Sequence, residues 1–160
     1  MKNRKLKILD REAMRTERKR LAAQDHTVVF TNGCFDILHV GHVDYLTFAR
    51  NQGDALVVGL NSDTSVAKIK GNGRPFIPQE ERETLLDALE VVDYVVIFDE
   101  DEPAGMIADI LPDVLVKGED WKHYVSGREI VEKNGGRVVL APLIKERSTT
   151  NIIERIRANE

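Results

Sequence analysis

From residue 26 onward, short apolar runs rich in β-forming residues alternate along the chain with helical patterns. The runs are TVVFT at 27–31, ALVVGL at 55–60, YVVIF at 94–98, DVLVK at 113–117 and RVVLA at 137–141. The helical patterns lie near 41–52, 79–90, 103–111, 124–134 and 149–158. Strands that alternate with helices predict a parallel sheet with crossover helices, and apolar strand centres indicate that both faces are covered. We therefore expect an α/β sandwich of three layers around a mostly parallel sheet of five strands.

The length of the chain, 160 residues, predicts one domain at 26–160, preceded by a lead-in and a helix at 1–25. No run of about 18 uncharged apolar residues occurs, and the first residues lack the apolar core of a secretory signal. The single cysteine, Cys34, forms no intrachain disulfide and supplies no zinc cluster. We therefore expect a cytoplasmic protein in a reducing compartment, with no membrane partner.

The charge of the chain is uneven. Residues 1–24 hold nine Lys and Arg and three acids, although the whole chain has a net charge of −4. Such a basic segment is typical either of an arm that binds nucleic acid or of a solvated helix packed on the domain. Apolar residues interleave with the charges at Leu6, Ile8, Leu9, Met14 and Leu21. They favour the packed helix, so we do not expect a nucleic-acid partner.

One long segment shows no periodicity. It runs from about 61 to 78 as NSDTSVAKIKGNGRPFIP, has turn residues at both ends and contains Lys68, Lys70 and Arg74. We expect a loop there. Long loops in compact domains are usually functional or disordered, and ligands of open α/β sheets bind at the carboxyl edge where this segment begins. Its position favours a functional loop.

The most specific stretch is TNGCFDILHVGH at 31–42, which runs off the first strand into the first helix. Gly41 lies between His39 and His42, so the backbone can approach a ligand closely, and the start of a helix suits a phosphate. Two imidazoles there can donate hydrogen bonds to phosphoryl oxygens as charge develops. The alternatives are two structural histidines or a metal pair. Within the stretch 31–42, Asp36 is the only carboxylate, which disfavours a metal.

With three further segments, this stretch resembles the H-x-G-H nucleotidyltransferases, the cytidylyltransferase-like family, over roughly residues 27–157. The segments are KGEDW at 117–121, RSTT at 147–150 and the lysines at 68 and 70. The resemblance implies a Rossmann-like fold and attack by a phosphate oxygen on the α-phosphorus of a nucleoside triphosphate. It implies a homo-oligomer, most simply a dimer, and Mg²⁺ held mainly by the substrate phosphates with no protein metal site.

Carried over to this chain, the resemblance implies a catalytic group of His39, His42 and Lys70. It implies nucleotide binding by Thr31, Asn32, Gly33, Phe35, Gly41, Lys117, Gly118, Asp120, Arg147, Ser148, Thr149 and Thr150. It implies a sugar-phosphate side of Asp36, Asn61, Asp63, Lys68 and Arg74. Simpler readings of single residues stay open: Ser148 or Thr149 as a plain helix cap, Trp121 as a packing residue, and the lysines at 68 and 70 as solvated.

Within the family, the chain is most similar to the adenylyltransferases that make ADP-heptose from ATP and D-glycero-β-D-manno-heptose 1-phosphate. The segments NSD at 61–63, KG at 70–71 with RP at 74–75, LVKG at 115–118 and STTNII at 148–153 suggest this subfamily. Its transferase is often fused to a sugar kinase, for which 160 residues leave no room, so we expect a stand-alone transferase. Glu119, where relatives often have Gly, and the basic lead-in depart from the pattern.

Two other functions stay open at this point. One is a cytidylyltransferase acting on glycerol 3-phosphate or a similar phosphoester, because GEDW at 118–121 also resembles that branch. The other is a nucleotide-binding or nucleic-acid-binding module without catalysis, which would use the basic lead-in.

Overall fold

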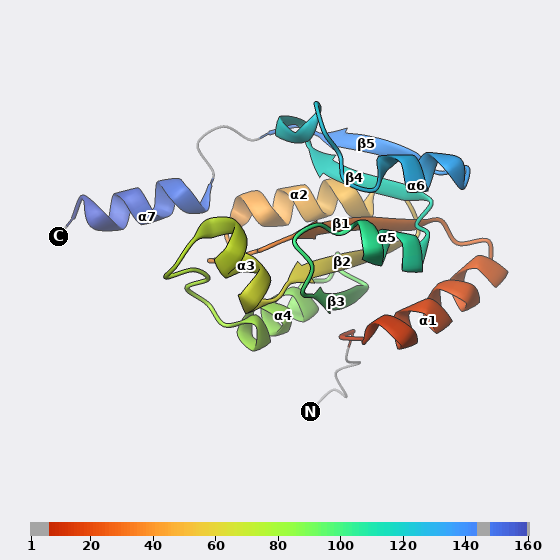
Figure 1. Ribbon diagram of the computed structural model, residues 1–160, viewed down its shortest axis with the longest axis horizontal. Helices are drawn as coiled ribbons and strands as arrows, with labels where there is room; N and C mark the ends of the chain where they lie inside the picture. Colours follow the sequence, from red (N-terminus) through yellow and green to blue (C-terminus); the bar gives the residue numbers. More distant parts are fainter. Residues whose placement is uncertain (1–6, 144–147, 160) are drawn as a thin grey trace.

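The computed structural model describes residues 7–143 and 148–159. Within them, five strands form one parallel sheet in the order β3-β2-β1-β4-β5 (Figure 1). The strands are β1 (Val28–Gly33), β2 (Ala55–Asn61), β3 (Tyr94–Phe98), β4 (Val114–Gly118) and β5 (Arg137–Ala141). The strand order reverses direction between β1 and β4, which is where ligands bind in open α/β sheets. The predicted sheet is confirmed, and all of its strand pairs are parallel.

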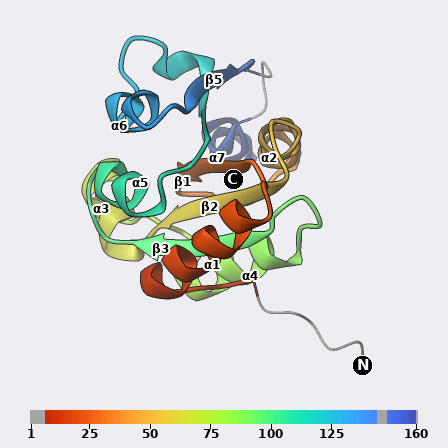
Figure 2. The same cartoon turned by 90° about the vertical axis from the view of Figure 1, so that its right-hand side faces the viewer.

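Helices cover both faces of the sheet, so the predicted three layers are confirmed (Figure 2). The face that includes Phe30 and Leu115 packs against α1 (Arg11–Ala23), α5 (Ala104–Ile110) and α6 (Arg128–Lys133). The opposite face, which includes Val29 and Val58, packs against α2 (Val40–Arg50) and α4 (Gln79–Ala88). Among the described residues, no helix has the length and apolar character needed to cross a membrane.

The prediction of a loop over 61–78 is wrong for its first half, which forms a helix, α3 (Asp63–Lys70). The Ser62 side chain caps this helix by accepting a hydrogen bond from the Ser65 amide at 3.2 Å. Gly71, at φ 93°, ends it, a conformation that glycine adopts freely. Only Ser65 and Val66 of the helix are buried, so the buried stripe is too short to show a helical period in the sequence.

The basic lead-in is packed on the domain. Residues 7–9 lie along the edge of β3, where the Leu9 amide donates to the Val95 carbonyl and the Val95 amide donates to the Lys7 carbonyl, both at 3.0 Å. Helix α1 follows and buries Met14 and Leu21 in the core. The interpretation as a packed helix is therefore confirmed for the part of the lead-in that the structure describes.

Candidate active site

A pocket of about 570 Å³ opens at the carboxyl edge of the sheet. It is bordered by the β1–α2 turn, the end of α3, the end of β4 and the start of α7 (Thr149–Arg157). Thirteen of the predicted site residues line it: Asn32, Gly33, Phe35, His39, Gly41, His42, Lys70, Lys117, Gly118, Asp120, Ser148, Thr149 and Thr150. The fold thus brings together residues from segments more than 100 positions apart in the sequence.

The two histidines cap the start of α2 with their own side chains. The Nδ1 atom of His39 accepts a hydrogen bond from the Gly41 amide at 3.1 Å, and the Nδ1 atom of His42 accepts one from the His39 amide at 3.3 Å. The imidazole rings stack with their centroids 3.9 Å apart. Because each Nδ1 is an acceptor, the proton of each neutral ring sits on Nε2.

Burial keeps this pair uncharged. Burial and, to a smaller extent, the neighbouring His39 lower the pKa of His42 to about 4, and burial also lowers the pKa of His39. Near neutral pH both rings are therefore neutral donors through Nε2. They lie beside the positive end of the α2 dipole. The two neutral rings can therefore donate hydrogen bonds to phosphoryl oxygens without carrying a positive charge themselves.

A buried arginine that the sequence argument missed holds the β1–α2 turn. The side chain of Arg82, in the first turn of α4, is fully buried and donates to the carbonyl of Cys34 at 2.6 Å and to that of Asn61 at 2.8 Å. It also donates to the Ile77 carbonyl at 2.9 Å and to the Asp63 carboxylate at 2.8 Å. The sequence does mark Arg82 as unusual, because the first turn of a helix favours acidic residues over an arginine.

Two lysines reach the pocket from different elements. Lys70 comes from the last turn of α3, and Lys117 comes from β4. Lys117 is only 7% exposed, and its Nζ lies 5.4 Å from the centre of the Trp121 ring. Burial lowers the pKa of Lys117 to about 8, although the charge of Asp120 raises it in part. At pH 7 Lys117 is therefore mainly a buried cation.

The start of α7 forms another wall. The Ser148 side chain caps the helix by accepting from the Asn151 amide at 3.1 Å, as the plain-cap reading predicts. The Thr149 hydroxyl donates to the backbone carbonyl of Asp36 at 3.0 Å, which ties α7 to the β1–α2 turn. Beyond this attachment α7 extends away from the sheet (Figure 1). The predicted phosphate ligand Arg147 lies outside the described residues.

The residues predicted for the sugar-phosphate side do not line the pocket. Asp36 is 2% exposed and accepts hydrogen bonds from Arg74 Nε at 2.8 Å and from the amides of Phe76 at 2.9 Å and Ile77 at 3.0 Å. Burial alone would raise the pKa of Asp36, but these three donors outweigh it and lower the pKa. Asp36 and Arg74 therefore fasten the 74–77 segment to the β1–α2 turn.

The other residues predicted for that side also have internal partners. The Asn61 amide donates to the Ser65 hydroxyl at 2.9 Å, and the Asp63 carboxylate accepts from Arg82. The Nζ atom of Lys68 lies 3.4 Å from a carboxylate oxygen of Asp101. Thr31, predicted to bind the nucleotide, is buried and donates to the Val116 carbonyl at 3.0 Å. Their proposed ligand roles stay predictions.

One side of the pocket contains no residue that was predicted from the sequence. It consists of Asp44, Tyr45 and Phe48 from α2 and of Ala141, Pro142 and Leu143 at and after the end of β5. Steps of three along a helix from His42 lead to Tyr45 and Phe48, so helical spacing was the available signal for these two. Nothing in the sequence pattern placed the end of β5 beside α2.

No group of three or more His, Cys, Asp or Glu side chains suited to a metal ion occurs among the described residues. Two carboxylates, Asp44 and Asp120, line the pocket. This donor set fits a Mg²⁺ ion that arrives with a triphosphate and keeps mostly phosphate and water ligands.

Residues 30–155 match the family model of cytidylyltransferase-like proteins. The chain belongs to the cytidylyltransferase-like family. The match covers both histidines, the β4 segment and the start of α7, so all walls of the pocket lie within the family domain.

Curated relatives carry the same domain within longer proteins. The chain is 55% identical over 147 residues to the bifunctional protein HldE of Syntrophotalea carbinolica, a match that covers 91% of this chain and 29% of that protein. It is 59% identical over 135 residues to the bifunctional protein HldE of Geobacter sulfurreducens, covering 84% of this chain and 28% of that one. The chain thus spans less than a third of the length of these two relatives.

Solved structures share the fold. A lipopolysaccharide core biosynthesis protein from Thermoplasma volcanium is 29% identical with a TM-score of 0.61, and the match covers 76% of this chain and 99% of that chain. A pantoate-beta-alanine ligase from Francisella tularensis, 14% identical, has a TM-score of 0.62 over 91% of this chain and 69% of its own. The second likeness concerns the fold alone.

Proposed function

We propose that this chain transfers AMP from ATP to D-glycero-β-D-manno-heptose 1-phosphate and so makes ADP-heptose and pyrophosphate. An oxygen of the sugar phosphate attacks the α-phosphorus of ATP and forms a new P–O bond. The bond from the α-phosphorus to the oxygen that bridges to the β-phosphorus breaks, and pyrophosphate leaves with its electron pair. The reaction needs no protein nucleophile, so Cys34 takes no covalent part.

The observation that carries this proposal is the pair of stacked, neutral imidazoles at the start of α2. Their Nδ1 atoms are held by backbone amides, which leaves the Nε2 protons for oxygens of the α-phosphate as charge develops on them. Phosphoryl-type transfer asks little more of a protein than in-line positioning and charge stabilisation. The start of α7 and Lys70 would receive the β- and γ-phosphates.

Similarity supports the choice of substrates. The segments that resemble ADP-heptose-forming adenylyltransferases agree with relatives named HldE at 55% and 59% identity. Those relatives are described as bifunctional, in keeping with a transferase that is often fused to a second enzyme. Mg²⁺, when bound with ATP, would neutralise phosphate charge, while His39, His42 and Lys70 would position the phosphate groups.

The direct test is pyrophosphate release by the purified chain with Mg²⁺. ATP, CTP, GTP and UTP are each combined with heptose 1-phosphate and with glycerol 3-phosphate. We expect release with ATP and heptose 1-phosphate. Release only with CTP and glycerol 3-phosphate would replace the proposal by the cytidylyltransferase alternative, and no release in any combination would reject both.

The role of the histidine pair has its own variant. His42→Ala should lower the turnover number by about 100-fold or more, because a transition-state donor is lost. Its affinity for ATP, measured by calorimetry, should stay close to that of the wild type. Wild-type turnover in this variant would contradict the role. The predicted dimer stays a prediction, which sedimentation velocity of the same preparation would check.

A further inference from the structure

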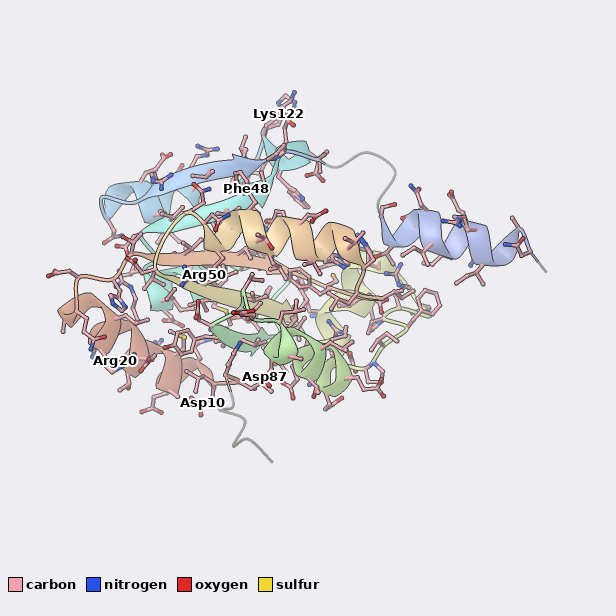
Figure 3. The ribbon with its side chains drawn as sticks, turned by 180° about the vertical axis from the view of Figure 1, so that it is seen from behind. Asp10, Arg20, Phe48, Arg50, Asp87 and Lys122 are labelled. Carbon is pink, nitrogen blue, oxygen red and sulfur yellow. The ribbon has the colours of Figure 1, made fainter. Side chains whose placement is uncertain are left out.

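The pocket has two chemically different ends. On the α2 side, Phe48, Ala141, Pro142 and Leu143 offer apolar and aromatic surface (Figure 3 marks Phe48 on α2). At the ends of the two central strands, Asn32 and Lys117 offer polar groups. The histidines and the start of α7 complete the lining.

The register of β1 against β4, extended by two residues, puts Asn32 and Lys117 at neighbouring positions on one face of the sheet. Phe30 of β1 pairs with Leu115 of β4, and Asn32 and Lys117 each follow two residues later in their strands. Because side chains alternate along a strand, both residues share the face of Phe30 and Leu115, which packs against Ile107 of α5. Helix α2 packs on the opposite face, so the pocket reaches across the sheet edge.

The side-chain oxygen of Asn32 is buried and has no hydrogen-bond partner within the described part of the chain. Such an atom is costly to leave unsatisfied, so it indicates a donor supplied by a ligand. Ionised phosphate oxygens only accept hydrogen bonds and cannot fill this role. The ligand group that faces Asn32 therefore carries an O–H or N–H.

Lys117 supplies the complementary group. Its ammonium only donates, and within residues 7–143 and 148–159 it has no hydrogen-bond or ion-pair partner, although the residue is only 7% exposed. The charge of Glu102, whose carboxylate accepts from the hydroxyls of Tyr124 at 2.8 Å and Ser126 at 3.0 Å, acts on Lys117 from the α5 side. An acceptor and a donor thus lie next to each other at this end.

We propose that Asn32 and Lys117 bind the hydroxyl groups of the sugar in the acceptor, Asn32 accepting from one hydroxyl and Lys117 donating to another. A polyol needs paired donors and acceptors, whereas a flat base is better matched to the apolar end near Phe48 and Leu143. The presence of a sugar acceptor rests on the proposed function. Sugar recognition is thereby assigned to two side-chain groups that have no hydrogen-bond partner in the described part of the chain, the Asn32 oxygen and the Lys117 ammonium, in place of Asp36, Asn61, Asp63, Lys68 and Arg74.

The test uses Asn32→Leu and Lys117→Met, which keep the approximate shape of each side chain. We expect the KM for heptose 1-phosphate to rise about tenfold or more in each variant, while the Kd for ATP, measured by calorimetry without sugar, changes less than about threefold. Lys122→Met is the matched control, because Lys122 is exposed and projects from the edge of the molecule (Figure 3). It should leave both constants unchanged.

A substrate without hydroxyls makes the test specific. Binding of methyl phosphate should be equal in the wild type and in both variants, whereas binding of heptose 1-phosphate should be weakened. Equal losses for both phosphates would show that these residues bind phosphate and would overturn the inference. A loss confined to ATP would overturn it in favour of nucleotide recognition.

Binding also separates this inference from the proposed function. If the wild type binds heptose 1-phosphate through Asn32 but releases no pyrophosphate, the proposed function fails and the sugar subsite stands. If the wild type releases pyrophosphate with heptose 1-phosphate and Asn32→Leu has a normal KM, the sugar subsite fails and the proposed function stands. If the wild type binds no sugar phosphate, both fail.

Discussion

Basic residues occur both in α1 and around the pocket, but their surroundings differ. In α1, Arg11 donates to Glu100 at 2.6 Å, and Arg18 donates to Asp113 at 3.0 Å. In the pocket, Lys70 and Lys117 have no ion-pair partner among the described residues. Four arginines of α1 are therefore paired with carboxylates within the fold: Arg11, Arg15, Arg18 and Arg20. The cations that line the pocket come instead from segments with little excess charge. Whether a basic side chain has an acidic partner in the fold therefore indicates a binding surface better than the number of basic residues in a segment does.

The largest effect should come from the paired carboxylate beside the site. Asp36→Ala removes the acceptor of Arg74 and of two backbone amides, so we expect the free energy of unfolding to fall by about 3–5 kcal/mol. Urea denaturation would measure this. An unchanged stability together with a raised KM for the sugar phosphate would instead return Asp36 to the ligand role predicted from the sequence.

Acid should weaken the fold through His42. Burial lowers the pKa of His42 from 6.5 to about 4. Between these pH values the unfolded chain binds a proton that the folded chain excludes, so the free energy of unfolding falls as the pH drops from about 6.5 towards 4, by up to about 3 kcal/mol. Above pH 6.5 this contribution is constant.

The midpoint of thermal unfolding, measured across this pH range, checks the expectation. The wild type should lose stability more steeply than His42→Asn, because the variant lacks the titrating group. Parallel slopes would mean that His42 is as accessible to protons in the folded chain as in the unfolded one.

In α1, a partly buried pair should have a smaller effect. Arg18→Met removes hydrogen bonds to the Leu111 carbonyl and to Asp113, and the Arg18 side chain is 17% exposed. We expect a loss of about 1 kcal/mol in the free energy of unfolding with unchanged pyrophosphate release. A fall in turnover at unchanged stability would contradict the purely structural role of α1.

The smallest effect belongs to an exposed pair. Arg15 pairs with Asp109, and its side chain is 49% exposed. Arg15→Met should change the free energy of unfolding by less than about 0.5 kcal/mol and leave the Kd for ATP unaffected in low and high salt. A salt-dependent loss of ATP affinity would show that this helix takes part in binding and would remove the contrast between the two regions.

The five strands of the sheet could be predicted because strands covered on both faces are continuous apolar runs that differ from the rest of the sequence. Each predicted run forms a strand. Helix α3 was missed because its buried stripe is short, although Ser62 and Gly71 carried cap signals. The histidine pair could be predicted because both members lie within one local stretch. The partners of Asp36 and Asp63 lie 38 and 19 residues away, and sequence spacing does not reveal such pairings.

Asp36 serves two segments at once. Its carboxylate holds residues 74–77, which continue from the helix that carries Lys70, and its backbone carbonyl receives the hydroxyl of Thr149 at the start of α7. Two walls of the pocket are thus anchored to a single residue, three positions before His39. A displacement of the β1–α2 turn would therefore move the segment that follows α3 and the start of α7 together.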